Sequence, residues 1–311
     1  MSKITKALEK AARERLQKMQ ARPTAKAQPV EVAIETPQAH GGEIVVAGRI
    51  AIDPHIVAAT DPNSPIAEQY RILRTNLQSL RLSGGSKVIV VTSAINNEGK
   101  SVTAMNLALT LARQEQLKVV LVDADFRKIS VSRWLGLERS EDGLSWALLR
   151  GGELNGDLVT LKEPPVTVLM AGPHPEHPSE LLESASMKRL LATLKARFDM
   201  VIVDAPPVLP VADPGIIAAH ADGVLLVVRA GKTQRKTVVQ AQALLKQMRA
   251  NLLGCVLTHV EYYMPGYGYR YGYRYGYGSK ESRKSTTTQS KKAPSEQADS
   301  YTDAAVASPR G

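Results

Sequence analysis

Cysteine is nearly absent from this sequence, and the single one, Cys255, cannot form an internal disulfide. It lies in the apolar run from Leu252 to Val260, which predicts a small buried core residue in a reducing cytosol. No stretch approaches the ~18 to 20 uninterrupted apolar residues that cross a bilayer. The first residues form a charged amphipathic pattern without the apolar region of a signal peptide. These absences predict a soluble, cytoplasmic protein.

The rest of the composition is that of a globular protein with unequal ends. Of its 311 residues, 43% are apolar and 23% are charged, which suffices for about one sizeable α/β domain. The formal net charge is +10, but part of the excess of Lys and Arg lies in the two ends, where solvation is the default explanation. We therefore predict no specific nucleic-acid partner.

Composition divides the chain into five segments. Residues 1–20 place apolar side chains at helical spacing among charges, which predicts an amphipathic helix that either docks on a partner or membrane or stays solvated. Residues 21–60 are rich in Pro, Ala, Gln and Gly, and we interpret them as a linker. Residues 61–261 carry the patterns of one folded domain. Residues 262–278 form a tyrosine cluster, and residues 279–311 are predicted to be a disordered polar tail.

A strand, a loop and a helix are predicted between Lys87 and Ala108. The segment AINNEGKS follows the P-loop spacing, with Ala94 where the first glycine usually stands. In such a loop the backbone N–H groups surround a β-phosphate, a lysine reaches the β- and γ-phosphates, and a serine binds the bridging Mg²⁺. A chance Gly-Lys-Ser turn that caps a helix is the alternative. The predicted nucleotide-binding residues are Ala94, Ile95, Asn96, Asn97, Glu98, Gly99, Lys100, Ser101 and Val102.

Two later apolar runs end in aspartates. LKVVLVDADFR contains Asp123 and Asp125, and FDMVIVDAPP contains Asp204. Carboxylates at the carboxyl ends of strands in an open α/β sheet face the crevice where ligands bind, so we expect all three near Lys100. Any one of them alone would more simply be a helix cap or turn residue. Arg127 and Lys128 follow the first pair and are expected to contact either phosphate or a neighbouring subunit.

A helix is predicted from Ser64, its cap, to about Leu82. On it Glu68, Arg71 and Arg74 recur every three residues and therefore share one surface. From spacing alone, a solvated face is favoured over an intersubunit contact. Further strands and helices alternate from residue 118 to residue 260, with one helix predicted from Ser179 to Arg197. This alternation predicts an α/β fold with a mostly parallel sheet covered on both faces.

Eight of the ten tyrosines lie in the segment EYYMPGYGYRYGYRYGYG, interleaved with Gly and Arg. They are Tyr262, Tyr263, Tyr267, Tyr269, Tyr271, Tyr273, Tyr275 and Tyr277. Such a segment cannot bury enough apolar surface to fold alone. A sticky low-complexity tail, a nucleic-acid stacking segment and a set of accessible phosphoacceptors are the three interpretations, and sequence physics does not choose among them.

Taken together, these motifs resemble the bacterial P-loop protein-tyrosine kinases that autophosphorylate and control export of capsular or extracellular polysaccharide. The resemblance covers about Ser64 to Tyr277 and rests on SPIAEQYRILRTNL, AINNEGKS, VLVDADFRK, VIVDAPPVLPVAD and the tyrosine cluster. It implies a P-loop NTPase fold, ATP and Mg²⁺ as cofactors, and transfer of the γ-phosphoryl group to the eight tyrosines. The opening MSKITKALEKAA is similar to stand-alone kinases of exosortase-associated exopolysaccharide loci.

The resemblance also implies roles for individual residues. Lys100, Asp123, Asp125 and Asp204 form the catalytic set, with Asp123 assisting the attacking tyrosine. Ser101, Asp125 and Asp204 bind the metal. Glu68, Arg71 and Arg74 mediate ring-like self-association, which reverses the preference from spacing. The implied partners are other copies of the chain, a membrane polysaccharide co-polymerase or chain-length regulator as activator, and a cognate tyrosine phosphatase; the kinase would be held peripherally at the inner face of the plasma membrane.

The chain departs from the family at one place. Family loops read Pro-Gly-Glu-Gly before the lysine, whereas Asn96 and Asn97 replace Pro-Gly here. Asparagine tolerates left-handed backbone, so Asn97 is expected to keep the shape of the loop. Two rival functions remain: a MinD- or ParA-like ATPase switch, which would carry a lysine at the position of Ile95, and a non-catalytic nucleotide-binding scaffold of the polysaccharide machinery.

Overall fold

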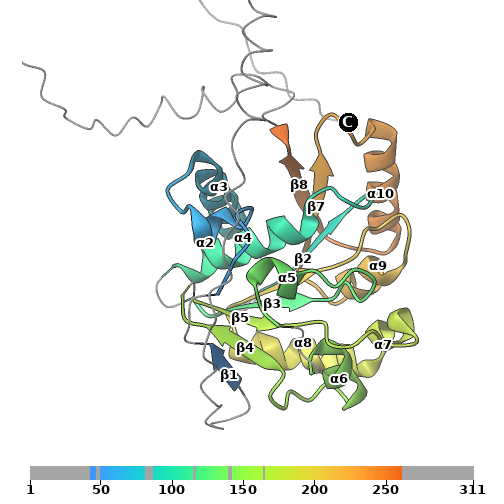
Figure 1. The fold of residues 1–311 in the computed structure, drawn as a ribbon. Coiled ribbons are helices and arrows are strands. Elements are labelled where there is room, and N and C mark those ends of the chain that lie inside the picture. Colours follow the sequence, from blue (N-terminus) through green and yellow to red (C-terminus); the bar gives the residue numbers. More distant parts are fainter. Residues whose placement is uncertain are drawn as a thin grey trace, which may run out of the picture.

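The computed structural model describes residues 43–46, 50–80, 87–114, 117–138, 142–163 and 165–260 (Figure 1). The predicted N-terminal helix, the tyrosine cluster and the C-terminal tail lie outside these residues. The described part is built on an eight-stranded sheet. In spatial order its strands are β1 (Glu43–Val46), β4 (Leu158–Leu161), β5 (Val166–Leu169), β3 (Val119–Asp123), β6 (Met200–Asp204), β2 (Lys87–Ser93), β7 (Gly223–Arg229) and β8 (Leu252–Thr258).

The centre of the sheet is parallel and buried. Strands β5, β3, β6, β2, β7 and β8 run parallel, and β4 pairs antiparallel with β5. The sequences KVIVVTS, VVLVD and MVIVD have few charges and many β-branched residues because both faces of these strands are covered. The α/β prediction with a mostly parallel sheet is confirmed.

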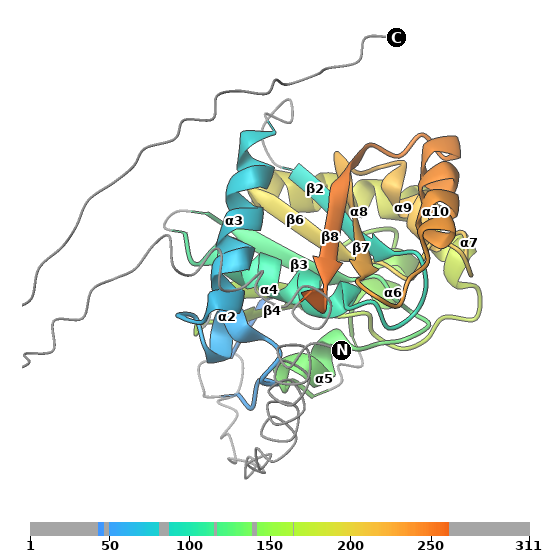
Figure 2. The same cartoon turned by 90° about the horizontal axis from the view of Figure 1, so that it is seen from above.

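Helices cover both faces of the sheet. Those of the described residues are α2 (Val57–Thr60), α3 (Pro65–Ser79), α4 (Lys100–Ala112), α5 (Val131–Leu135), α6 (Leu144–Leu149), α7 (Pro178–Glu183), α8 (Ala185–Arg197), α9 (Asp213–Ala218) and α10 (Arg235–Gln247). One core cluster joins the sheet to α2, α3, α4 and α5, and the other joins it to α6, α7, α8, α9 and α10. Figure 2 places α3 and α10 on opposite sides of the strands.

Three sequence-based expectations need correction. The predicted linker does not extend to residue 60, because Ile56 and Ala58 are buried against α4 and Asn106 binds the backbone of this segment. The helix predicted from Ser179 to Arg197 is two helices, since Ser184 adopts an extended conformation between them. Cys255 is exposed because β8 is at the edge of the described sheet.

No helix among the described residues has the length and apolar character that a membrane span requires.

Candidate active site

The candidate site lies at the carboxyl ends of three adjacent strands. The phosphate loop follows β2, Asp123 ends β3 and Asp204 ends β6. Strand β6 lies between the other two, and the register places Asp123 directly beside Asp204. Strand order therefore brings together residues that lie over 100 positions apart in the sequence, as the strand-end pattern predicts.

The phosphate loop uses left-handed backbone at two positions. Asn97 has φ 65° and Gly99, which precedes α4, has φ 96°. Asparagine and glycine are the residues that adopt this region most readily, so the expectation that Asn97 keeps the loop shape is confirmed at the level of the backbone. The start of the loop is braced by the segment after β6, because the N–H of Leu209 donates to the carbonyl of Ala94.

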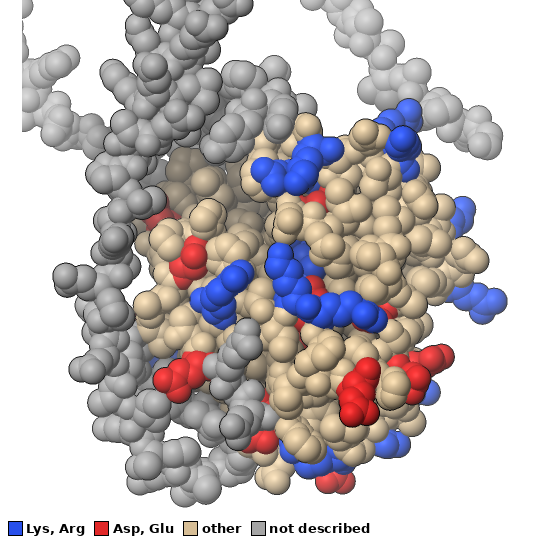
Figure 3. All heavy atoms as spheres, turned by 45° about the vertical axis from the view of Figure 1, so that its right-hand side comes forward, with Lys and Arg blue, Asp and Glu red and all other residues tan. Residues whose placement is uncertain are grey.

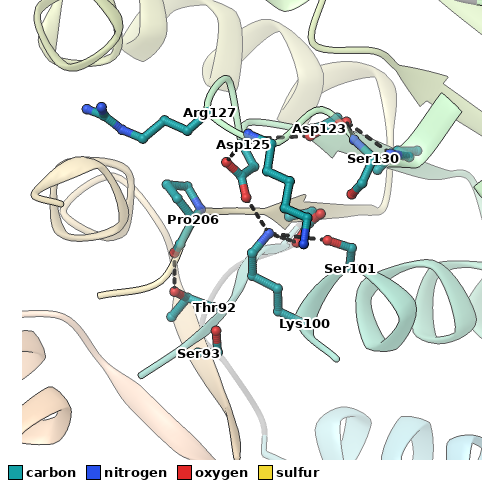
Figure 4. Close-up of polar contacts among 12 residues, drawn as sticks. Thr92, Ser93, Lys100, Ser101, Asp123, Asp125, Arg127, Ser130 and Pro206 are labelled. Carbon is teal, nitrogen blue, oxygen red and sulfur yellow. Dashed lines mark hydrogen bonds and ion pairs between the residues drawn. The ribbon is translucent and has the colours of Figure 1, made fainter. Parts of the chain in front are cut away.

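Lys100 is held between two buried carboxylates (Figure 4). Its Nζ lies 2.7 Å from Oδ2 of Asp125 and 3.2 Å from Oδ1 of Asp204. It also donates a hydrogen bond to Oγ of Ser101 at 3.2 Å. The predicted grouping of lysine, serine and strand-end aspartates is thus present in space. Because all these charged side chains are nearly inaccessible to solvent, their interactions are only weakly screened.

Burial and mutual repulsion set the proton affinities of these groups. Burial, and after it the nearby carboxylate of Asp204, raise the pKa of Asp123 to about 7 against the attraction of Lys100. Burial also raises the pKa of Asp204, although Lys100 and the Ser101 hydroxyl oppose that shift. Burial alone would lower the pKa of Lys100, but the carboxylates of Asp204 and Asp125 outweigh it and raise the pKa above its ordinary value.

Asp123 is fully buried and its oxygens accept backbone hydrogen bonds. Oδ1 accepts from the N–H of Asp125 at 3.2 Å, and Oδ2 accepts from the N–H of Val131 at 3.2 Å. These bonds fix the turn between β3 and α5. Asp123 therefore combines a raised pKa with a rigid position.

The donor set fits a hard divalent cation. Oδ2 of Asp204 is buried and has no hydrogen-bond partner among the described residues, which leaves a carboxylate oxygen free for a ligand. Further oxygens are available from the hydroxyl of Ser101 and the carboxylate of Asp125, which both contact Nζ of Lys100. Mg²⁺ prefers one or two carboxylates, oxygen ligands and a phosphate, and this combination matches.

Glu98 does not take part in the site through its side chain. Its carboxylate is buried, with Oε2 accepting the N–H of Ile95 at 2.9 Å and Oε1 accepting the Thr233 hydroxyl. Its backbone carbonyl accepts the hydroxyl of Thr258 at 2.8 Å. The loop is therefore fastened to the turn after β7 and to the end of β8. Sequence analysis missed Thr233 and Thr258, since neither belongs to a motif.

The side chains of Arg127 and Lys128 contact different parts of the domain. Arg127 donates to Asp213 at 3.0 Å and to Ser179 at 3.3 Å, and Figure 4 shows it directed away from Lys100. Nζ of Lys128 donates to Oδ1 of Asn97 at 2.9 Å. Lys and Arg side chains gather near the middle of one face of the domain (Figure 3).

The three residues expected to mediate self-association lie on α3 and contact their own chain. Arg71 pairs with Glu68 at 2.5 Å and donates to the carbonyl of Pro62. Arg74 donates to the carbonyl of Thr110 at 3.3 Å, while its Nε is buried without a hydrogen-bond partner among the described residues.

Comparison with known proteins places this geometry in a family. Residues 86–253 match the AAA domain family. The chain is 39% identical over 214 residues to the tyrosine-protein kinase YwqD of Bacillus subtilis, covering 67% of this chain and 90% of that one. The chain belongs to the bacterial tyrosine-protein kinases.

Other members agree with this assignment. The kinase is 34% identical over 202 residues to the tyrosine-protein kinase CpsD of Streptococcus agalactiae, covering 65% of this chain and 86% of CpsD. Its fold is similar to the solved kinase domain of the Escherichia coli tyrosine kinase ETK. The TM-score is 0.63 at 29% identity, over 70% of this chain and 88% of that one. The predictions of family, P-loop fold and tyrosine kinase class are confirmed.

Proposed function

We propose that this kinase transfers the γ-phosphoryl group of ATP to its own tyrosine cluster, from one copy of the chain to another. The observation that carries the proposal is the convergence of Lys100, Asp125 and Asp204 beside a phosphate loop, in a chain with eight tyrosines beyond β8. The acceptors are Tyr262, Tyr263, Tyr267, Tyr269, Tyr271, Tyr273, Tyr275 and Tyr277.

Each residue of the site has a proposed task. The backbone of residues 94–102 binds the phosphates, and Lys100 compensates charge on the β- and γ-phosphates. Asp123 accepts the tyrosine proton directly or through a water molecule, for which a pKa of about 7 is suited at neutral pH. Most of the rate acceleration then comes from positioning and charge stabilisation.

Magnesium is the proposed metal, held by Ser101, Asp125 and Asp204. When bound, it would supply positive charge to the phosphate oxygens. To bind it, Asp125 and Asp204 must share their oxygens between the metal and Lys100, which the free Oδ2 of Asp204 permits.

At the level of the cell, we propose that the kinase regulates polymerisation and export of an extracellular polysaccharide. It would act at the inner face of the plasma membrane through a membrane co-polymerase that activates it, and a cognate phosphatase would reverse the modification. Glu68, Arg71 and Arg74 would join copies into a ring. Phosphates add roughly −1.5 to −2 charges each, so a modified cluster would repel itself and loosen the ring.

The test is phosphotyrosine on purified protein after incubation with ATP and Mg²⁺, with and without cytoplasmic extensions of the candidate membrane partner. Lys100→Met and a variant with all eight cluster tyrosines changed to Phe are run beside it. We expect the signal to disappear in both variants. Tyr70, whose pKa is raised by burial beside Thr103 and Asn106, provides an internal tyrosine that should stay unmodified.

Two results would contradict the proposal. Phosphotyrosine that persists in the Phe variant would place the acceptors elsewhere. ATP hydrolysis without any phosphotyrosine would instead favour an ATPase switch. For the cellular role, cells carrying Lys100→Met should make less extracellular polysaccharide, and an unchanged yield would argue against it.

A further inference from the structure

A second lysine contacts the phosphate loop. Lys128 lies in the loop that leaves β3, three residues after Asp125. Its ammonium donates a hydrogen bond of 2.9 Å to Oδ1 of Asn97, which belongs to the phosphate loop. This contact joins the loop after β2 to the loop after β3.

The backbone of Lys128 is fixed by the carboxylate that also holds Lys100. The N–H of Lys128 donates to Oδ1 of Asp125 at 2.9 Å and to its carbonyl at 3.2 Å. The other oxygen of Asp125 lies 2.7 Å from Nζ of Lys100. Because Asp125 is only 1% exposed, both lysines are arranged around one rigid group.

The positive charge of Lys128 is not neutralised by a carboxylate within the described part of the chain. Lys100 has two carboxylate partners, and Arg127 is paired with the buried Asp213. Lys128 instead contacts a neutral amide oxygen. An exposed cation held without a counter-charge beside a phosphate loop is available to an anionic ligand.

The side chain of Asn97 supplies a hydrogen-bond acceptor that a glycine at this position would lack. Its φ of 65° would be adopted by glycine with less strain, so the backbone alone does not need a side chain here. The amide oxygen, however, gives Lys128 an acceptor that positions it over the loop. This pairing also gives a physical purpose to the place where the loop departs from Pro-Gly.

We propose that Lys128 is a further catalytic residue, which contacts the γ-phosphate of ATP and is positioned by Asn97. The inference rests on the proposed nucleotide site. Lys128 keeps its proton throughout: the γ-phosphorus exchanges its bond to the bridging oxygen for one to the tyrosine oxygen, and the tyrosine proton goes to the base. The ammonium stabilises charge on the γ-phosphate oxygens, which ADP does not have.

The test compares the binding of a non-hydrolysable ATP analogue with that of ADP, by titration calorimetry in the presence of Mg²⁺. In Lys128→Met the affinity for the ATP analogue should fall roughly tenfold or more, the usual effect of losing one charge-assisted hydrogen bond, while ADP binding stays within about twofold. The rate of phosphotyrosine formation at saturating ATP should fall roughly tenfold to a hundredfold.

Three variants separate the contact from general effects. Asn97→Gly keeps the backbone conformation but removes the acceptor, so it should lower affinity for the ATP analogue in the same direction but less. The double variant should be little worse than Lys128→Met alone, because the two residues act as a unit. Lys118→Met makes the same charge change at the opposite, amino end of β3, and it should alter neither affinity.

Several outcomes decide the matter. Equal loss of affinity for ADP and the ATP analogue, no loss for either, or a matching loss in Lys118→Met would overturn the role of Lys128. If the wild type forms no phosphotyrosine yet Lys128→Met selectively loses the ATP analogue, the proposed function fails and the Lys128 contact stands. If phosphotyrosine forms at the wild-type rate in Lys128→Met with unchanged binding, the proposed role of Lys128 fails and the proposed function stands.

Discussion

The carboxylate of Glu98 in the phosphate loop accepts a hydrogen bond from the hydroxyl of Thr233, 135 positions later in the chain. The same oxygen, Oε1, accepts the N–H of Arg229 at 3.3 Å, and Oε2 accepts the N–H of Ile95 at 2.9 Å. A charged residue of the loop is thus turned away from the phosphates and used to hold the loop. Negative charge at the phosphate position would oppose nucleotide binding, and burial on neutral donors avoids that conflict.

Removing the hydrogen bonds of the Glu98 carboxylate should loosen the phosphate loop and weaken the binding of all nucleotides alike. In Glu98→Ala the N–H of Ile95 and the Thr233 hydroxyl lose their acceptor, and we expect affinities for ADP and ATP to fall together, by roughly tenfold. Thr233→Val should have a smaller effect in the same direction. Thr193→Val removes an exposed helix hydroxyl and serves as the control. A selective loss of ATP over ADP in Glu98→Ala would contradict a purely positional role.

Replacing Lys100 should destabilise the empty site. Without the ammonium, Asp125 and Asp204 are two buried carboxylates with no cation at contact distance, and breaking a buried pair in this way costs about 3 to 5 kcal/mol. Urea unfolding of Lys100→Met without nucleotide or Mg²⁺ measures this cost. Adding Asp125→Asn to Lys100→Met should restore part of the lost stability.

The matched control is the surface pair of Lys195 and Asp222, whose Nζ and Oδ2 lie 2.9 Å apart with both side chains about one-third exposed. Lys195→Met should cost less than about 1 kcal/mol, because water screens an exposed pair. Equal losses for Lys100→Met and Lys195→Met would mean that burial does not amplify the interaction.

Residues 50–60 should be needed for a stable domain. Oδ1 of Asn106 accepts the N–H of Ala58 at 2.8 Å, and its Nδ2 donates to the carbonyl of His55 at 3.0 Å. A chain that begins at residue 61 would leave Asn106 in α4 without these partners and expose apolar surface. It should unfold at lower urea concentration than one that begins at residue 43. Identical midpoints would restore the linker interpretation.

Cys255 should be accessible but slow to react at neutral pH. The thiol is exposed on β8, yet partial desolvation raises its pKa, so less of the reactive thiolate is present than in a free cysteine. Iodoacetamide should add one label to the native protein, with a rate that keeps rising at pH values where a model thiol has levelled off. A rate curve with a midpoint below that of the model thiol would contradict the raised pKa.

The sequence alone determined the fold class, the phosphate loop and the strand-end aspartates, because these follow from local patterns. Runs of β-branched residues indicate short buried strands, and the fixed spacing of a phosphate loop indicates that it binds phosphate. Asp123, Asp125 and Asp204 could be assigned to one site because parallel strands end at one edge of a sheet.

Tertiary structure decided the rest. Strand order put β6 between β2 and β3, which fixes Asp204 beside both Asp123 and Lys100. The position of β8 at the edge left Cys255 exposed, although its apolar run resembles that of a buried strand. The hydrogen bonds of Glu98 with Thr233 and of Asn97 with Lys128 join residues that no spacing in the sequence pairs with each other. Such contacts depend on how distant loops meet in space, and no local pattern records that.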